Sequence, residues 1–311
     1  MIWDSRSLSV FLASAQTGSF GRAARQLNMN QPTVTRIIRR MEDRFGVPLF
    51  DRTPTGVAPN VYGQAFLPYA NLVLAEIENA GQVIDSLRGA SVGIVRVGGV
   101  GSLASGHLAT ALHRMLITRP ALQAQIVEAI EDKLLEALKR GEVDLAISPE
   151  PYFDPEITLA CTEILHDEIG AFAAPDHPLA GCAEISLEAA ARHPWVLPTD
   201  ETPLTREWQR RFFSRGLDPR PAAAASRSVN MLKQLATLGG LICWMPSGLV
   251  HHEVAQTRLV RLDIPDLAWA REFRIYRRRN GQLPPAAHVL LKELQDIIHA
   301  DPEKNPGIIH Q

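Results

Sequence analysis

The segment Gly18–Phe45 constrains the fold most strongly, because apolar residues spaced for helices alternate there with signals that end and begin helices. Three successive series of apolar residues step by three or four positions, as amphipathic helices require. The series are Leu8, Phe11, Leu12 and Ala15; then Phe20, Ala23, Ala24 and Leu27; then Val34, Ile37, Ile38, Met41 and Phe45. We therefore predict three short helices that share one small core.

The residues between these series predict where each helix ends and begins. Gly18 stops the first helix and Ser19 caps the second. Residues 28–30 form a turn, with Asn30 or Gln31 as the N-cap of the third helix and Pro32 in its first turn. Two short helices joined by a tight turn on one core predict a helix-turn-helix.

The third predicted helix has a basic face directed away from the core. At about 100° per residue, its polar positions lie opposite Val34, Ile37 and Met41. Arginine can bond guanine through two hydrogen bonds, and the first residues of such a helix reach deepest into the major groove. We expect Gln31, Thr33 and Arg36 to contact bases and Ser19, Arg39 and Arg40 to contact the DNA backbone, with Pro32 and Thr35 on the same face. The alternative is a charged face that only water contacts.

A short hairpin is predicted after the third helix. Residues 47–52 and 57–58 are β-prone and flank Thr53-Pro54-Thr55-Gly56, which has the residues of a turn. This hairpin would form a wing. Arg52 at its edge either contacts the DNA backbone or minor groove, or contacts only water.

These residues resemble the N-terminal domain of the LysR-type transcriptional regulators. The matching segments are Leu8–Phe11, Gly18–Phe20, Ala23-Ala24, Leu27, QPTVT (Gln31–Thr35), Met41-Glu42, Gly46, LFDR (Leu49–Arg52) and Gly63. The chain departs from the family at Ala58-Pro59, where Leu-Thr is usual and Asn60 can serve as N-cap instead, and at Thr35, where Ser is usual. The resemblance implies a winged helix-turn-helix that binds double-stranded DNA at an interrupted inverted repeat, with RNA polymerase as a further partner.

A long helix is predicted to follow, over residues 61–88. Its apolar residues repeat every seven positions, in steps of four and three: Phe66, Ala70, Val73, Ile77, Ala80, Ile84 and Leu87. Two chains could pair along this seam, which would place two basic helices about one turn of DNA apart or a multiple of that. The alternative is a helix that packs on its own domain.

Beyond a small-residue hinge at residues 88–91, strand and helix patterns alternate. Such alternation implies parallel strands with crossover helices. Strands are expected at 92–97, 124–129, 144–148, 168–174, 195–197, 221–225, 241–244, 259–264 and 273–277, and helices at 107–118, 132–140, 204–215, 229–238 and 286–299. Segments at Gly93–Gly98, Leu138–Ile147, Asp176–Ala180, Trp195–Pro198 and Gly239–Pro246 resemble the effector-binding domain of the same regulators.

The resemblance implies a two-lobed α/β domain, like the type 2 periplasmic binding proteins, that holds a small-molecule effector in its cleft. The predicted organisation is multidomain: a winged helix-turn-helix over 1–60, a linker helix over 61–88, a first lobe over 89–165 plus 266–299, a second lobe over 166–265, and a tail over 300–311. A homodimer through the linker helix, assembled further into a tetramer, is expected.

Several residues are candidates for effector contacts. Small or hydroxyl-bearing residues follow predicted strands or precede predicted helices at Gly101, Ser102, Thr199, Thr202 and Ser228, where unpaired helix amides could bind an anion. The alternative for each hydroxyl is simple helix capping. Glu131 stands where family members that bind aromatic acids tend to present a hydroxyl. In the cleft its carboxylate would suit an amine or a polyol; otherwise it is an exposed residue at a strand end.

The composition of the chain limits the functions that it can have. The net charge of −2 divides into +4 for residues 1–60 and −6 for the remainder, so positive charge collects where DNA binding is expected. Three cysteines without C-x-x-C spacing indicate neither a disulfide framework nor a metal site.

We expect a cytoplasmic protein, since no export signal or membrane span stands out. No catalytic motif is present, so we expect no enzyme and no cofactor. A binding protein whose first domain contacts proteins, and an enzyme on the two-lobed fold, remain the alternatives.

Overall fold

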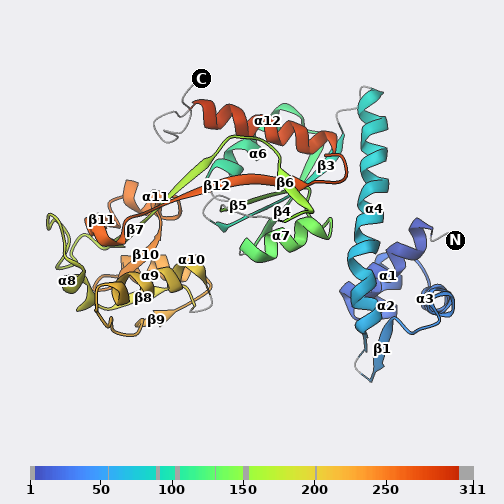
Figure 1. The fold of residues 1–311 in the computed structure, drawn as a ribbon, viewed down its shortest axis with the longest axis horizontal. Helices are drawn as coiled ribbons and strands as arrows, with labels where there is room; N and C mark the ends of the chain where they lie inside the picture. The colour runs from blue at the N-terminus through green and yellow to red at the C-terminus, as the bar shows by residue number, and fades with distance from the viewer. Residues whose placement is uncertain are drawn as a thin grey trace.

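The structure, a computed structural model, describes residues 4–54, 56–88, 92–101, 106–129, 131–149, 154–199 and 202–300. A small helical domain and a larger α/β part lie on opposite sides of one long helix (Figure 1). No helix in the described part of the chain has the length and apolar character needed to span a membrane.

The first domain is a winged helix-turn-helix, as predicted. It consists of α1 (Ser5–Thr17), α2 (Phe20–Gln26), α3 (Gln31–Phe45) and the hairpin of β1 (Phe50–Thr53) with β2 (Gly56–Pro59). The predicted caps are present: Gly18 has a left-handed backbone with φ 62°, and the Asn30 side chain accepts a hydrogen bond from the Thr33 amide at 2.9 Å. The core joins the three helices to the hairpin through Phe11, Ile38 and Phe50. Phe45, expected in this core, is 40% exposed at its rim.

Helix α4 (Val61–Leu87) begins against the wing and ends against the α/β part. Asn60 is its N-cap and accepts hydrogen bonds from the amides of Tyr62 and Gly63, both at 3.0 Å. Just past its middle, Glu76 pairs with Arg278 at 2.9 Å, and Glu78 pairs with Arg96. The helix therefore connects the two halves of the molecule through specific polar contacts.

The predicted seam of α4 divides into two parts. Phe66 and Ala70 pack into the core of the first domain, so the expectation that they belong to a dimer seam is corrected. Phe66 lies against the Phe11 ring, with the ring centroids 5.1 Å apart. The later members Val73, Ile77, Ile84 and Leu87 are 47–79% exposed and form a continuous apolar strip. Within one chain, nothing described covers that strip.

The α/β part is built on a ten-stranded mixed sheet in the order β4-β3-β5-β12-β7-β10-β8-β9, with β6 paired to β12 and β11 to β7. The elements of the first lobe are β3 (Gly93–Gly99), α6 (His107–Thr118), β4 (Leu122–Glu128), α7 (Glu131–Lys139), β5 (Leu145–Pro149), β6 (Ile157–Leu159) and α12 (Pro285–Ala300). Its strands β3, β4 and β5 are parallel, as expected.

The second lobe and the strands that join it complete the sheet. Its elements are β7 (Leu165–Ala173), α8 (Leu187–Ala191), β8 (Trp195–Leu197), α9 (Pro203–Ser214), β9 (Ala224–Ala225), α10 (Val229–Thr237), β10 (Ile242–Pro246), α11 (Ser247–Ala255), β11 (Val260–Leu262), the 3-10 turn Pro265–Leu267 and β12 (Trp269–Arg278). Strand β12 pairs with β7 over residues 269–273 and with β5 over residues 273–276. Because β12 belongs to both lobes, the two lobes share one continuous sheet.

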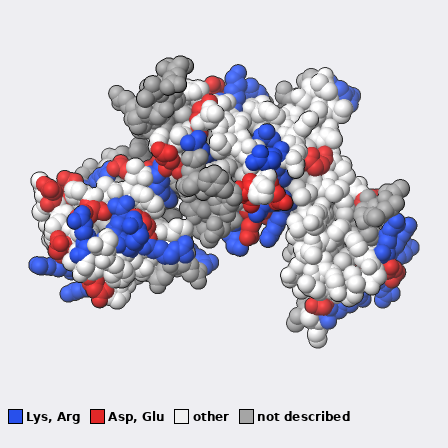
Figure 2. Space-filling view, in the orientation of Figure 1, with Lys and Arg blue, Asp and Glu red and all other residues white. Residues whose placement is uncertain are grey.

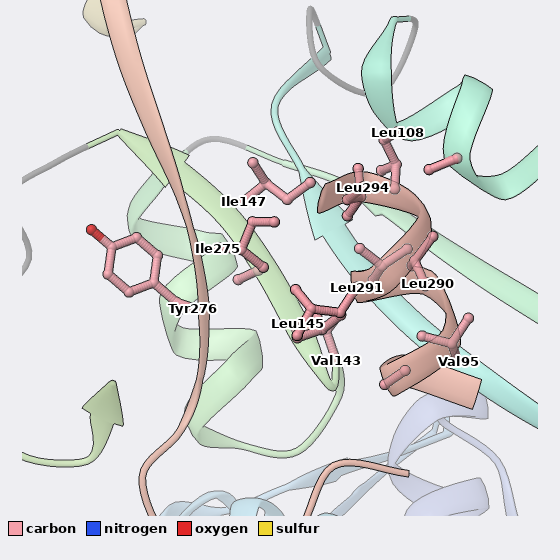
Figure 3. Close-up of a cluster of buried hydrophobic side chains, with 14 of the residues drawn as sticks. Val95, Leu108, Val143, Leu145, Ile147, Ile275, Tyr276, Leu290, Leu291 and Leu294 are labelled. Atoms are coloured by element: carbon pink, nitrogen blue, oxygen red, sulfur yellow. The ribbon is translucent and has the colours of Figure 1, made fainter. Parts of the chain in front are cut away.

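Each lobe has its own apolar core. In the first lobe, α6 and α12 cover one face of the sheet and α7 covers the other (Figure 1), which buries both faces of β5. Figure 3 shows Leu290, Leu291 and Leu294 of α12 in one buried cluster with Ile147 and Ile275 of the sheet. In the second lobe, the rings of Trp195 and Trp208 pack edge to face, with centroids 5.4 Å apart. The exact division at residues 165/166 and 265/266 stays a prediction.

Candidate functional site

The outward face of α3 is a basic groove. It is lined by Gln31, Pro32, Thr35, Arg36, Arg39, Arg40 and Asp43. The groove faces outward because Val34, Ile38 and Met41 on the opposite side of the helix are buried in the core. In the space-filling view, basic side chains gather over α3 at the edge of the molecule farthest from the two lobes (Figure 2). The arrangement offers several guanidinium groups to one partner.

The arginines of this face form no direct ion pair within the described residues. Arg36, Arg39 and Arg40 are exposed and take part in no ion pair there. Gln31 is exposed beside α2, where its side-chain oxygen lies 3.3 Å from the place that a Cβ on Gly21 would occupy. Guanidinium groups without carboxylate partners can form charge-assisted hydrogen bonds with phosphate or guanine. The groove therefore has the chemistry that DNA binding requires.

Three other predicted DNA contacts also have roles within the fold. The Arg52 guanidinium lies 3.7 Å from a Glu42 oxygen and 5.6 Å from the centre of the Phe20 ring. Its side chain is still 46% exposed, so one edge is open to a partner. The Ser19 hydroxyl caps α2 by accepting a hydrogen bond from the Arg22 amide at 3.4 Å. Thr33, in the first turn of α3, is half-buried.

The predicted effector contacts of the second lobe include two helix caps. The Thr202 hydroxyl accepts a hydrogen bond from the Thr205 amide at 3.3 Å, and the Ser228 hydroxyl accepts one from Met231 at 3.3 Å. These are the capping roles that the sequence left open as the alternative. Thr199 differs, because its hydroxyl is buried and has no hydrogen-bond partner in the described part of the chain. A buried hydroxyl without a partner is a place where a ligand or water can bind.

The first-lobe candidates lie at the carboxyl ends of the parallel strands. Gly101 follows β3, and a Cβ on it would lie 2.7 Å from an oxygen of Glu128, the last residue of β4. Ser102 lies outside the described residues. Glu131 is the first residue of α7, and its side chain is outside the described part of the structure. The carboxylate beside Gly101 therefore comes from Glu128, which the sequence did not single out.

Two further polar groups at this end of the sheet were missed. The Ser148 hydroxyl near the end of β5 and the His166 Nε2 atom at the start of β7 are buried, and neither has a partner among the described residues. Ser148 lies opposite Arg274 in the sheet, and His166 lies opposite Glu272. Ligands of open α/β sheets bind outside the carboxyl ends of the strands. A signal for these residues existed only in the pairing of distant strands, which no local pattern reveals.

No group of three histidine, cysteine or acidic side chains among the described residues could hold a metal ion. Burial raises the pKa of the Cys161 thiol and of the Cys243 thiol to about 12. Both thiols are therefore protonated at neutral pH and are poor nucleophiles.

A winged helix-turn-helix with a basic face, carried on a long helix beside a two-lobed α/β unit, defines a class of DNA-binding regulator with a ligand-binding type of domain. Comparison with protein families agrees with this class. Residues 5–64 match the family described as bacterial regulatory helix-turn-helix protein, lysR family, and residues 88–297 match the LysR substrate binding domain. The chain belongs to the LysR family of DNA-binding transcriptional regulators.

The similarity to known relatives and to solved structures extends over nearly the whole chain. The RuBisCO operon transcriptional regulator of Allochromatium vinosum is 28% identical over 284 residues, which cover 91% of this chain and 92% of that protein. The regulator CbbR of Xanthobacter flavus is 26% identical over 295 residues, or 94% and 87% of the two chains. Full-length OxyR of Pseudomonas aeruginosa has a TM-score of 0.71 at 18% identity, covering 95% of each chain.

A further solved structure, full-length CbnR complexed with its target DNA, has a TM-score of 0.66 at 21% identity. It covers 94% of this chain and 99% of that chain. Both structural likenesses support the fold alone. The relatives are transcriptional regulators, in agreement with the family assignment.

Proposed function

We propose that the chain binds operator DNA as a homodimer through α3, and that a small-molecule effector between the two lobes modulates this binding. The observation that carries the proposal is the outward face of α3, where three exposed arginines that form no ion pair in the described chain lie on a helix anchored by its buried side. The proposal places the protein in the cytoplasm, where the bacterial chromosome is accessible. It assigns no catalytic step, metal or cofactor.

The residues of the DNA-binding domain divide into two groups in this proposal. Gln31, Thr33 and Arg36 in the first turns of α3 contact bases, and Arg39, Arg40 and Ser19 hold the DNA backbone, together with Pro32, Thr35 and Arg52 at the edges of the contact. Base contacts confer sequence preference, whereas phosphate contacts confer affinity that depends on salt. Removing a side chain from each group therefore has different consequences.

The dimer is proposed to form along the exposed strip of α4. Val73, Ile77, Ile84 and Leu87 lie on one side of that helix and are covered by nothing else described in the chain. Pairing of two such strips would bury apolar surface and place two α3 helices on one DNA duplex, at two halves of an inverted repeat. Further pairing of the effector domains would give a tetramer, and contact with RNA polymerase would follow at the promoter.

The effector is proposed to bind at the strand ends, where Gly101, Ser102 and Glu131 of the first lobe and Thr199, Thr202 and Ser228 of the second were predicted. The unpaired Thr199 hydroxyl and the Glu128 carboxylate beside Gly101 support this placement. A carboxylate at the site favours a ligand with an amine or several hydroxyl groups over an acid. Binding of a ligand between the lobes would shift their arrangement by a coupling of about 1–3 kcal/mol.

The DNA-binding proposal is tested by selecting preferred duplexes from a random pool with the full chain, and then measuring affinity for the selected and for random DNA. Arg36→Ala is expected to lower the ratio of the two affinities, since one bidentate base contact contributes about 1–3 kcal/mol of discrimination. Arg192→Ala, which removes an exposed arginine from the second lobe, is the control. An unchanged ratio for Arg36→Ala would contradict the assignment of Arg36 to base contacts.

The effector proposal is tested by thermal unfolding of the full chain in the presence of amines, sugars, small acids and aromatic compounds. A ligand present at 100 times its Kd adds about 2.7 kcal/mol to the stability of the part that binds it. Thr199→Val should remove that gain, whereas Thr118→Val, on the exposed face of α6, should keep it. A gain that persists in Thr199→Val would place the ligand elsewhere.

A further inference from the structure

A second groove lies on the first lobe, where β12 ends and α12 begins. Its polar lining includes Arg277, Arg279, Gln282 and His288, and its apolar lining includes Leu283 and Leu291. Its volume is about 590 Å³, which lies within the range of small-molecule sites, roughly 300–1,000 Å³. These residues include none of those proposed for the effector between the lobes.

The two arginines of this groove are not neutralised. Arg277 donates one hydrogen bond to the Arg278 carbonyl at 3.2 Å. Arg279 donates two, to the carbonyls of Pro155 at 2.8 Å and Ile157 at 3.1 Å. Carbonyl oxygens orient a guanidinium but carry no net charge. Neither arginine forms an ion pair within the described part of the chain, so the groove presents two oriented positive charges.

Other arginines of β12, in contrast, do form ion pairs. Arg271 pairs with Asp167 at 2.6 Å, and Arg278 pairs with Glu76 of α4 at 2.9 Å. The Glu76 carboxylate also lies beside Gly281, where a Cβ would be 2.9 Å away, but Arg278 already neutralises it. The charges on the groove side of β12 are therefore left for a partner from outside the chain.

The other residues of the groove can contact the uncharged part of a small organic anion. Leu283 is half-buried and packs at the edge of the first-lobe core, to which Leu291 belongs, so both offer apolar surface. The Gln282 amide and the His288 ring are exposed at the rim and can form hydrogen bonds. A carboxylate or phosphate group can accept paired hydrogen bonds from arginine, while a short apolar chain lies on the leucines.

We propose that this groove is a second ligand site, which binds a small organic anion with its charged group on Arg277 and Arg279. The site lies directly beside the contact between Arg278 and Glu76 that joins the first lobe to α4. A ligand bound to Arg277 and Arg279, on either side of Arg278, would therefore affect the contact between the first lobe and the linker helix α4. The site is independent of the proposed effector position between the lobes.

The test is isothermal titration of the full-length protein with hexanoate, hexyl phosphate, inorganic phosphate and the neutral compound hexanol. We expect the two amphiphilic anions to bind once per chain and more tightly than inorganic phosphate, and hexanol not to bind. Arg277→Gln should weaken hexanoate binding about tenfold or more, because it removes hydrogen bonds to a charged group. Arg277 has one hydrogen bond to a carbonyl, so this change should leave the thermal unfolding profile intact.

Control variants distinguish binding in this groove from nonspecific attraction to surface arginines and from binding between the lobes. Arg192→Gln with Arg206→Gln removes two exposed charges from the second lobe and should leave hexanoate binding unchanged. Thr199→Val should also leave it unchanged, whatever its effect on a ligand between the lobes. The proposal is overturned if no anion binds at millimolar concentration, if hexanol binds as tightly as hexanoate, or if Thr199→Val removes binding while Arg277→Gln does not.

Discussion

Replacing Gly63 by alanine tests how α4 packs against the DNA-binding domain. A Cβ on Gly63 would lie 2.1 Å from the Leu49 carbonyl oxygen and 3.1 Å from the Pro59 Cβ. The same carbonyl accepts a hydrogen bond from the Asn60 amide at 3.0 Å, so the helix cannot move away without losing it. Overpacking costs typically 1–3 kcal/mol, and a contact of 2.1 Å with a backbone atom places the cost at about 2–3 kcal/mol, of which the better helix propensity of alanine returns about 1 kcal/mol. We expect a net loss of roughly 1–2 kcal/mol.

Gly81→Ala is the matched control, because it makes the same change in the same helix with no atom within 4 Å of the new Cβ. It should stabilise α4 by about 1 kcal/mol through propensity alone. Native-state amide hydrogen exchange measures both effects locally. Protection of the α1 and α3 amides should fall roughly 5- to 30-fold in Gly63→Ala and stay unchanged in Gly81→Ala. If Gly63→Ala is as protected as the wild type, α4 does not lie against Leu49 as described.

Three other substitutions test contacts elsewhere in the structure. Asn60→Ala removes the cap of α4 and should cost about 1–2 kcal/mol, seen as reduced exchange protection in the first turn of α4. Hydrogen bonds from Arg210 and Arg211 hold the pKa of the Glu207 carboxyl below its ordinary value, so its contribution is present above that value of 4.5 and is lost as the pH falls. Glu207→Gln should thus lower the stability of the second lobe by about 1 kcal/mol at pH 7, with the difference from wild type shrinking below pH 4.5 in thermal melts; a constant difference would rule out this ion pair as the cause. Ile77→Glu should weaken the dimer at least tenfold by light scattering without unfolding the chain, because Ile77 is 51% exposed; an unchanged dimer would place the interface elsewhere.

The helix-turn-helix could be predicted from the sequence because its signals are local. Gly18, Asn30 and Pro32 specify helix ends through their own backbone preferences, and the spacing of Val34, Ile38 and Met41 specifies the buried side of α3. Once that side is known, the outward arginines follow from helix geometry. The basic face of the candidate site was therefore predictable residue by residue.

Features that depend on distant pairing could not be predicted in this way. The heptad pattern correctly indicated a helix, but it could not show that Phe66 packs against Phe11 while Ile77 is left exposed. The short elements β6 and α8 are too brief to produce a periodic pattern. Glu128 was missed because only the sheet determines where β4 ends and which carboxylate meets Gly101. Thr202 and Ser228 carry the same local pattern whether they cap a helix or bind a ligand.

The central claim is that the outward face of α3 holds DNA, and the salt dependence of binding to random-sequence duplex tests it most directly. The logarithm of affinity should fall linearly with the logarithm of salt concentration, with a slope of about −0.9 for each phosphate contacted. Arg39→Ala should make that slope shallower by about 1 for each bound chain, whereas Arg192→Ala should leave it unchanged. Equal slopes for wild type and Arg39→Ala, or no salt-dependent affinity at all, would contradict the claim.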